Sequence, residues 1–249
     1  MLNARSFFVV TCFLFCLASP MPSRAEGSLR GLLLRFDEPE GRRFTDYSGS
    51  GHTITPVGSV TRSTTDKVSG ASSVCFDGNG YLEIDASSDF YFDGDLTIDF
   101  WFKSSHESRQ HALTIGSALF AENIDFNFVD GTGFWLYWNS GGTNAIRYGT
   151  PLQYMNGAWH HVAMVRSQGT IKAYIDGIAR GGVTYTQPLG SNTRKVRVGS
   201  ASSSDSGAAF GWHGCIDELR IINGRALWNP DDNRFDPMLY LAPPLNAFR

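Results

Sequence analysis

Two short stretches of the sequence carry the side chains best suited to contact a ligand. Asp99, Trp101 and Lys103 are spaced two residues apart, so in a strand they would share one face. Trp135 and Tyr137 have the same spacing and would form a second such face. The C–H face of a sugar ring packs well on an indole or phenol ring. We therefore predict these five residues as the ligand-contacting set. In the alternative interpretation, about half of the aromatic side chains in each stretch lie in the core, and a loop covers Trp101.

Residues with a catalytic arrangement are much harder to find. His160 and His161 are adjacent, so on a strand their side chains diverge and would not share a metal ion. The other histidines lack the spacing of a zinc site, and no nucleophile elbow, phosphate loop or dinucleotide fingerprint occurs. The chemistry points to binding, and we expect no enzymatic activity.

The first ligand stretch lies in the clearest strand of the sequence, residues 96–103. Its alternate positions are apolar, namely Leu96, Ile98, Phe100 and Phe102. This period of two predicts one face in a core and a different face opposite. Turn residues on both sides indicate an all-β domain built from facing rows of this kind.

Further alternating runs predict the rest of the sheet framework. The expected strands are residues 32–37, 73–77, 81–84, 133–138, 159–166, 170–176, 195–198 and 215–222. Two pairs of these strands would form hairpins. One hairpin would turn at residues 78–80 and the other at residues 167–169. No long helical period and no internal repeat occurs.

The first 25 residues have the pattern of a signal peptide. Arg5 precedes an apolar stretch at residues 7–18, and Ser23 and Ala25 are the small residues of a signal-peptidase site. We expect cleavage after Ala25 and a secreted or extracytoplasmic protein. No later stretch approaches the roughly 18 apolar residues of a membrane span.

The rest of the chain divides into one domain and a tail. Residues 26–228 are long enough for a single β-sandwich, and the proline-rich residues 229–249 would be an extended strap or a flexible end. Loss of residues 1–25 removes two arginines and no acid, so the formal charge falls from −3 to −5. An acidic chain without a basic run argues against nucleic acid as the main partner.

Cys75 and Cys215 remain after removal of the signal peptide. In an oxidising compartment they could form a disulfide, and the alternative is two buried thiols. A disulfide would close a long loop and stabilise the fold by roughly 4 to 5 kcal/mol.

Taken in order, these motifs resemble the laminin-G-like jelly roll of the concanavalin A-like lectin and glucanase group. The resemblance rests on residues 76–78 with 81–84, 96–103, 159–163, 174–177 and 214–221, preceded by residues 36–38 and 46–52. It covers nearly all of residues 30–225. It implies a two-sheet antiparallel sandwich with one concave sheet, and a role in binding glycans, proteins or surfaces. It does not imply an activity, because this fold also carries hydrolases.

Glucanases of this group use closely spaced carboxylates, about 5 Å apart in a retaining enzyme. The nearest candidates here are Glu83 with Asp85, Asp93 with Asp95, and Asp217 with Glu218. The first pair lies at a strand end, the second lies in a glycine turn, and the third points to opposite faces. A glucanase-type hydrolase is therefore the less favoured interpretation.

The resemblance also implies calcium, which members of the group often hold at the rim of the sandwich. Asp37, Asp77 and Asp217 are the candidate ligands, since calcium prefers carboxylate and carbonyl oxygens. If the two cysteine strands were parallel neighbours, Asp77 and Asp217 would meet. In the alternative, Asp217 accepts backbone N–H bonds and the other two are turn residues.

Together these observations predict a secreted, non-catalytic module that binds carbohydrate or a glycosylated surface. The alternative is a structural or adhesive module that contacts other proteins in a cell-surface or virion assembly.

Overall fold

The computed structural model describes residues 30–39, 41, 43–116, 123–129, 133–138, 144–201, 210–229 and 231–240. The predicted signal peptide lies outside these residues. The strands are β1 Gly31–Leu34, β2 Ile54–Ser63, β3 Ser73–Ile84, β4 Tyr91–Phe92, β5 Leu96–Lys103, β6 Gln110–Gly116, β7 Asn123–Val129, β8 Gly133–Trp138, β9 Ala145–Tyr148, β10 Trp159–Ser167, β11 Thr170–Ile175, β12 Ile178–Thr184, β13 Leu189–Gly190, β14 Val196–Val198 and β15 His213–Asn223. The short helices are η1 Ser88–Phe90, α1 Pro151–Tyr154 and η2 Pro237–Tyr240. No helix in this part of the chain is long and apolar enough to cross a membrane.

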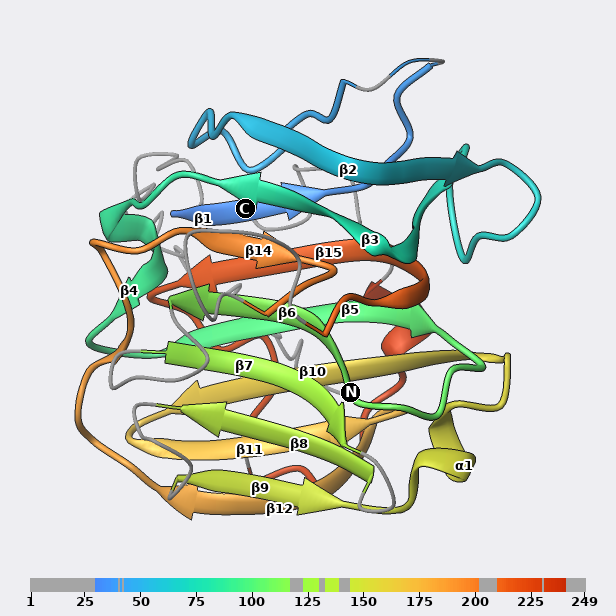
Figure 1. Ribbon diagram of the computed structural model, residues 1–249. Coiled ribbons are helices and arrows are strands. Elements are labelled where there is room, and N and C mark those ends of the chain that lie inside the picture. Colours follow the sequence, from blue (N-terminus) through green and yellow to red (C-terminus); the bar gives the residue numbers. More distant parts are fainter. Residues whose placement is uncertain are drawn as a thin grey trace, which may run out of the picture.

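The strands form two antiparallel layers, as the jelly-roll prediction requires. The hydrogen-bonded order is β12-β11-β10-β5-β15-β3-β14-β6-β7-β8-β9. Figure 1 shows β14, β6, β7, β8 and β9 in front of a back layer that contains β15, β5, β10, β11 and β12. We call these the front layer and the back layer.

The long strand β3 joins the two layers. Its first half pairs with β15 of the back layer, and its last three residues pair with β14 of the front layer. At the opposite edge, β9 and β12 lie side by side (Figure 1), and a Cβ on Gly181 would lie 2.9 Å from Ile146. The sandwich is therefore nearly closed at that edge, and β2 is left as an outer strand beside β3.

The core lies between the layers and follows the predicted alternation. Leu96, Ile98, Phe100 and Phe102 of β5 are fully buried. They pack against an aromatic row from the front layer, where the Phe102 and Phe128 rings lie 5.0 Å apart. The strand with the clearest sequence signal is thus central to the back layer.

The predicted hairpin at residues 78–80 is wrong. Residues 73–84 are one continuous strand that pairs with β2, and the pairing register shifts between Gly58 and Val60. Gly80 lies so close to Ser59 that a Cβ would be 2.2 Å from its carbonyl oxygen. The glycines therefore accommodate an irregular strand pair rather than a chain reversal. The second predicted hairpin is confirmed as β10 and β11.

Cys75 and Cys215 form a disulfide, which decides between the two possibilities left open by the sequence. The two residues are directly opposite in the antiparallel pair of β3 and β15. The bond therefore links two strands that are already neighbours in the sheet, while the residues are 140 positions apart in sequence.

The described segment after β15 lies against the outer side of the back layer. We call residues 225–229 and 231–238 the C-terminal strap. The Trp228 and Phe235 rings stack at 4.1 Å, and the Tyr174 hydroxyl donates to the Asp232 carbonyl at 2.9 Å. Trp228 and Tyr174 form a small second core with Ala163 and Val165. The strap thus covers the outer faces of β10 and β11.

Candidate functional site

The outer surface of the front layer is lined by polar and aromatic side chains, and we call it the front face. The inward positions of these strands are core residues such as Leu113, Phe126 and Leu136. By strand alternation, the positions between them face outward. The outward residues are His111 and Thr114 from β6, Asn123, Asp125 and Asn127 from β7, Trp135 and Tyr137 from β8, Arg147 from β9 and Arg197 from β14.

Trp135 and Tyr137 form the aromatic part of this face, so the structure brings the second predicted pair together. Their ring centres lie 5.3 Å apart in an edge-to-face arrangement, and both rings are half-buried. The guanidinium of Arg147 lies 4.2 Å from the Trp135 ring centre and 5.9 Å from that of Tyr137. Two rings and a planar cation thus form a platform suited to stacking and hydrogen bonding.

A buried polar network supports this platform. The carboxylate of Asp125 lies 2.8 Å from His111 Nδ1, and it accepts hydrogen bonds from the Thr114 hydroxyl at 3.1 Å and the Asn127 amide at 2.9 Å. All four side chains are almost fully buried. In register, Asp125 stands opposite Tyr137. The network therefore fixes the strand surface from which the rings project.

Among the described residues of this face, several buried polar atoms have no hydrogen-bond partner. They are His111 Nε2, Asn127 Oδ1, and both amide atoms of Asn123. Buried polar groups are nearly always paired, and leaving one unpaired costs about 1–3 kcal/mol. These atoms are buried, so they form a polar layer beneath the aromatic platform and not a surface open to a ligand.

The Tyr137 hydroxyl is embedded in the same surroundings. Burial raises the pKa of Tyr137, while the guanidinium groups of Arg147 and Arg109 act in the opposite direction. The hydroxyl therefore stays protonated at neutral pH and can donate a hydrogen bond.

The first predicted ligand stretch lies on the other side of the molecule. Asp99 is buried, and Arg220 donates to its two oxygens at 2.8 and 2.7 Å while His161 Nε2 lies at 3.1 Å. Burial alone would raise the pKa of Asp99, but Arg220 and His161 hold it below its usual value. Trp101 packs edge-on against His161 at 5.2 Å. Asp99 is thus a structural ion-pair residue, and Trp101 lies beside it.

Lys103 is also engaged within the fold. Its amine lies 2.8 Å from Asp66, which also accepts a hydrogen bond from the Trp159 indole at 3.0 Å. The structure therefore separates the five predicted ligand residues into two groups on opposite faces. Only Trp135 and Tyr137 belong to the front face.

The three candidate calcium ligands are also divided. β3 and β15 are antiparallel, so Asp77 stands opposite His213 while Asp217 lies beyond Cys215 in the other direction. The condition that would have joined Asp77 to Asp217 is not met. Asp77 accepts a bond from the Asn79 amide at 2.9 Å, as a turn residue does.

Asp37 and Asp217 lie around one loop, residues 64–72. Asp217 accepts N–H bonds from Val68 at 2.8 Å and Ser69 at 3.2 Å, and Asp37 accepts from the amides of Ala71 and Ser72. These bonds match the alternative interpretation of the aspartates as acceptors of backbone amides.

Asp217 and the adjacent Glu218 are both buried beside this loop. Burial raises the pKa of Asp217 to about 6 and that of the adjacent Glu218 to about 7. The Oε2 atom of Glu218 is buried without a partner. Two neighbouring buried carboxyls favour a cation or a proton. Within the described ranges, however, no group of three or more Asp, Glu, His or Cys side chains has metal-binding geometry. Calcium would need backbone carbonyls and water as its other ligands.

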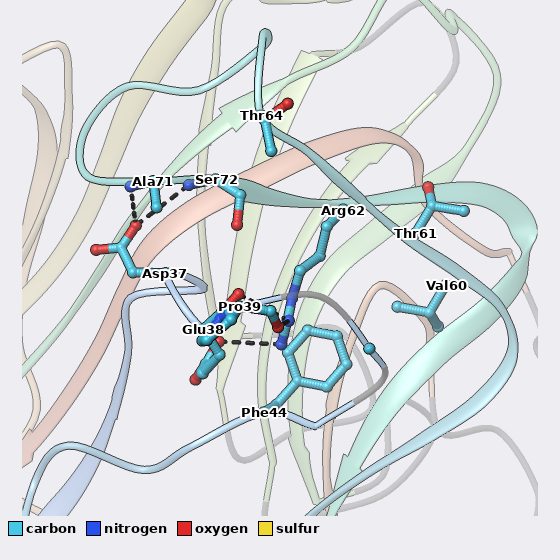
Figure 2. Close-up of a pocket in the computed structure, with 11 residues that line it drawn as sticks. Asp37, Glu38, Pro39, Phe44, Val60, Thr61, Arg62, Thr64, Ala71 and Ser72 are labelled. Carbon is cyan, nitrogen blue, oxygen red and sulfur yellow. Dashed lines mark hydrogen bonds and ion pairs between the residues drawn. The ribbon is translucent and has the colours of Figure 1, made fainter.

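A cavity of about 610 Å³ lies close to Asp37, between the segment before β2 and β2 itself. Figure 2 shows Arg62 crossing it towards Glu38 and Phe44. Arg62 pairs with Glu38 at 3.0 Å and lies 4.5 Å from the Phe44 ring centre. The Arg62 side chain therefore attaches the N-terminal segment to the sheet.

With this geometry in place, the comparisons define the class of the protein. The chain matches the model of the concanavalin A-like lectin/glucanases superfamily over residues 76–230, and it belongs to this family. A search of curated proteins gave no match.

Solved structures share the fold at low sequence identity. Domain 4 of AbnA, an extracellular arabinanase from Geobacillus stearothermophilus solved with arabinotriose, is 20% identical with a TM-score of 0.54, over 80% of this chain and 95% of that one. The binding domain of botulinum neurotoxin serotype G is 14% identical with a TM-score of 0.58, over 79% and 48%. The binding domain of botulinum neurotoxin DC, solved with SialylT, is 13% identical with a TM-score of 0.54, over 88% and 51%. The chain spans about half of each toxin structure, and these likenesses establish the fold alone.

The sequence interpretation missed most of the front face. The alternation of Ile124, Phe126 and Phe128 with Asp125 and Asn127 is a strand signal of the same kind as in β5. Strand β7 and its outward residues Asp125 and Asn127 could therefore have been predicted from the sequence. By contrast, the positions of His111 and Arg147 depend on strand order, which no local pattern reveals.

Proposed function

We propose that this protein is a secreted, non-catalytic module that binds carbohydrate on the front face. The observation that carries the proposal is the Trp135–Tyr137 platform beside the unpaired polar atoms of His111 and Asn127. A sugar stacked on Trp135 would lie above these buried atoms and would reach them only after the side chains that cover them move. Binding pockets for sugars combine such aromatic and polar groups.

Two further facts support carbohydrate binding on the front face. AbnA domain 4 and the DC toxin domain, which share this fold, were solved with arabinotriose and with SialylT. The outer side of the back layer is partly occupied by the C-terminal strap. Among the described residues, the front face is therefore a better candidate for ligand binding than the outer side of the back layer.

The carboxylates of this face support binding rather than hydrolysis. Glu83 and Asp125 are separated by β14 and β6, and three strand spacings amount to about 14 Å. A retaining glycosidase needs about 5 Å, and an inverting one about 6.5–9.5 Å. Glu83 is also paired with Lys195 at 2.6 Å and with Arg197 at 3.1 Å. On the described part of the face, the two carboxylates are too far apart for paired acid and base chemistry.

Secretion is proposed from the leader sequence at residues 1–25 and from the disulfide. A disulfide of this kind is typical of an oxidising, extracytoplasmic compartment. The two features agree with each other.

A glycan array probed with the purified chain tests the proposal, and Trp135→Ala is the diagnostic variant. We expect saturable binding that Trp135→Ala abolishes. Trp101→Ala is the matched control, because Trp101 is also a half-buried indole but lies on the back layer, and it should bind normally. A folded protein that binds no glycan, or one that loses binding only with Trp101→Ala, would refute the proposal. In the first case, self-association or capture of another protein would favour the adhesive alternative.

A further inference from the structure

Phe210 is an unusual residue at the margin of the front face. Its side chain is 52% exposed, and its backbone is left-handed with a φ of +53°. A left-handed conformation costs an L-residue other than glycine roughly 1 kcal/mol or more. A large exposed apolar ring gains nothing from the core in return. Such a combination of exposure and strain is characteristic of residues kept for binding.

The surroundings of Phe210 contain a cation and an unpaired imidazole nitrogen. The exposed Arg109 lies with its guanidinium 4.9 Å from the Phe210 ring centre. The His111 ring lies 5.9 Å from Phe210, and its buried Nε2 has no partner. The His111 amide donates to the Phe210 carbonyl at 3.0 Å, which fixes the backbone there. An aromatic ring, a guanidinium and an unpaired polar atom thus repeat the composition of the Trp135 platform.

The two aromatic groups are connected through the strand register of the front layer, by His111 and Asn127, which are themselves buried. His111 is opposite Asn127 on β7, and Asn127 is opposite Trp135 on β8. Two strand spacings place β6 and β8 about 10 Å apart, which is more than one sugar ring spans. Arg109 also acts electrostatically on the Tyr137 hydroxyl, so its charge reaches the first platform.

We propose that Phe210 and Arg109 form a second subsite, so that the front face binds an acidic oligosaccharide running from Trp135 to Phe210. The inference rests on the proposed function and adds to it the size and charge of the ligand. One sugar ring stacks on Trp135 and another on Phe210. An anionic substituent, a carboxylate or a sulfate, pairs with Arg109.

Charge favours an anionic substituent over a neutral one. Arg109 and Arg147 are exposed at the two ends of this surface. The carboxylate of Asp125 is buried and surrounded by three donors. The exposed charges described beside the two aromatic groups are therefore cationic, although the whole chain is acidic. A planar guanidinium binds carboxylate or sulfate oxygens in pairs.

The test is a quantitative array of neutral, carboxylated and sulfated glycans of one to six rings, probed with the full chain and its variants. Arg109→Ala should reduce the preference for acidic over neutral glycans about ten-fold. Arg30→Ala is its matched control, because Arg30 is an exposed arginine paired with Asp89 away from the front face. The carboxylated and sulfated arms distinguish the two sources of negative charge.

Phe210 is tested by two substitutions that differ in their effect on folding. Phe210→Ala and Phe210→Gly should both weaken binding of oligosaccharides about two- to ten-fold and leave single-ring ligands unaffected. Phe210→Gly should also raise the melting temperature relative to Phe210→Ala, because glycine relieves the left-handed strain. Tyr91→Ala, an exposed ring on β4, is the control.

The outcomes separate this inference from the proposed function. The inference is supported if the native chain binds acidic glycans and if both the Arg109 and the Phe210 variants bind them more weakly. Binding of neutral glycans alone, or an acidic preference unchanged by Arg109→Ala, would overturn the inference and leave carbohydrate binding intact. The absence of any glycan binding would overturn both.

Discussion

Arg147 lies directly over Trp135, with the guanidinium carbon 4.2 Å from the ring centre and the two residues paired across β8 and β9. A cation over an indole contributes about 0.5–2 kcal/mol and holds the ring in one orientation. The pairing of β8 with β9 therefore places Arg147 where it can hold the Trp135 ring in position.

Substitution Arg147→Ala should weaken glycan binding about two- to ten-fold, because the indole loses its orienting partner. The melting temperature should change little, since Arg147 is on the surface. Calorimetric titration with an array hit measures the effect. Tighter binding by the variant would show that Arg147 covers the ring instead of presenting it.

The disulfide should contribute strongly to stability. The double variant Cys75→Ser with Cys215→Ser is expected to lose about 2–5 kcal/mol of unfolding free energy, since the bond removes freedom from a 140-residue loop in the unfolded chain. Urea denaturation measures the loss, and reduction of the native protein should reproduce it. An unchanged denaturation midpoint after reduction would contradict this expectation.

Asp99 should make the free energy of unfolding depend on pH in the acid range. Its pKa is lower in the folded state than the ordinary 3.8, so its contribution is present above pH 3.8 and is lost as the pH falls through the folded-state value. Asp99→Asn should cost about 3–5 kcal/mol at pH 7, because Arg220 is left buried without its partner. The difference from the native protein should shrink as the pH falls below 3.8.

Urea unfolding of both proteins across this range checks the prediction, with the exposed Asp93→Asn as a control. A difference that stays constant with pH would show that the loss comes from packing and not from charge.

Calcium remains a prediction, and its test uses the separation of the two aspartates. If calcium binds beside Asp217, it should raise the melting temperature relative to chelator by a few degrees, since a ligand of the folded state stabilises it. Asp217→Asn should remove this effect. Asp77→Asn should retain it, because Asp77 lies in the opposite direction along the strand pair. Equal melting temperatures with calcium and with chelator would contradict calcium binding beside Asp217.

The sequence predicted the fold well because the fold is encoded in local alternation. The apolar row of β5 lies in the core as expected, and Cys75 and Cys215 are joined. The first feature follows from residue type and from a period of two, whereas the sequence left open whether the two cysteines were bonded. The false hairpin at residues 78–80 came from glycines that serve an irregular strand pair, a use that looks the same in sequence.

The site was harder to predict because it depends on neighbours distant in the chain. Asp99, Trp101 and Lys103 share a face as expected, but Arg220 and His161 on the adjacent strands take the carboxylate of Asp99. Nothing local to residues 96–103 indicates those partners. The outer position of Trp135 and Tyr137 could be predicted, whereas the proposed subsite at Phe210 depends on its backbone conformation and on contacts with Arg109 and His111.

The most direct test of the front face is an NMR titration of the six tryptophan indoles with a glycan identified on the array. Each indole N–H gives its own signal, so the six report from both layers and the core. We predict a saturable shift of the Trp135 signal, with Trp101 and Trp159 unmoved because they lie on the back layer. Shifts confined to Trp101 and Trp159 would place the ligand on the back layer and contradict the account.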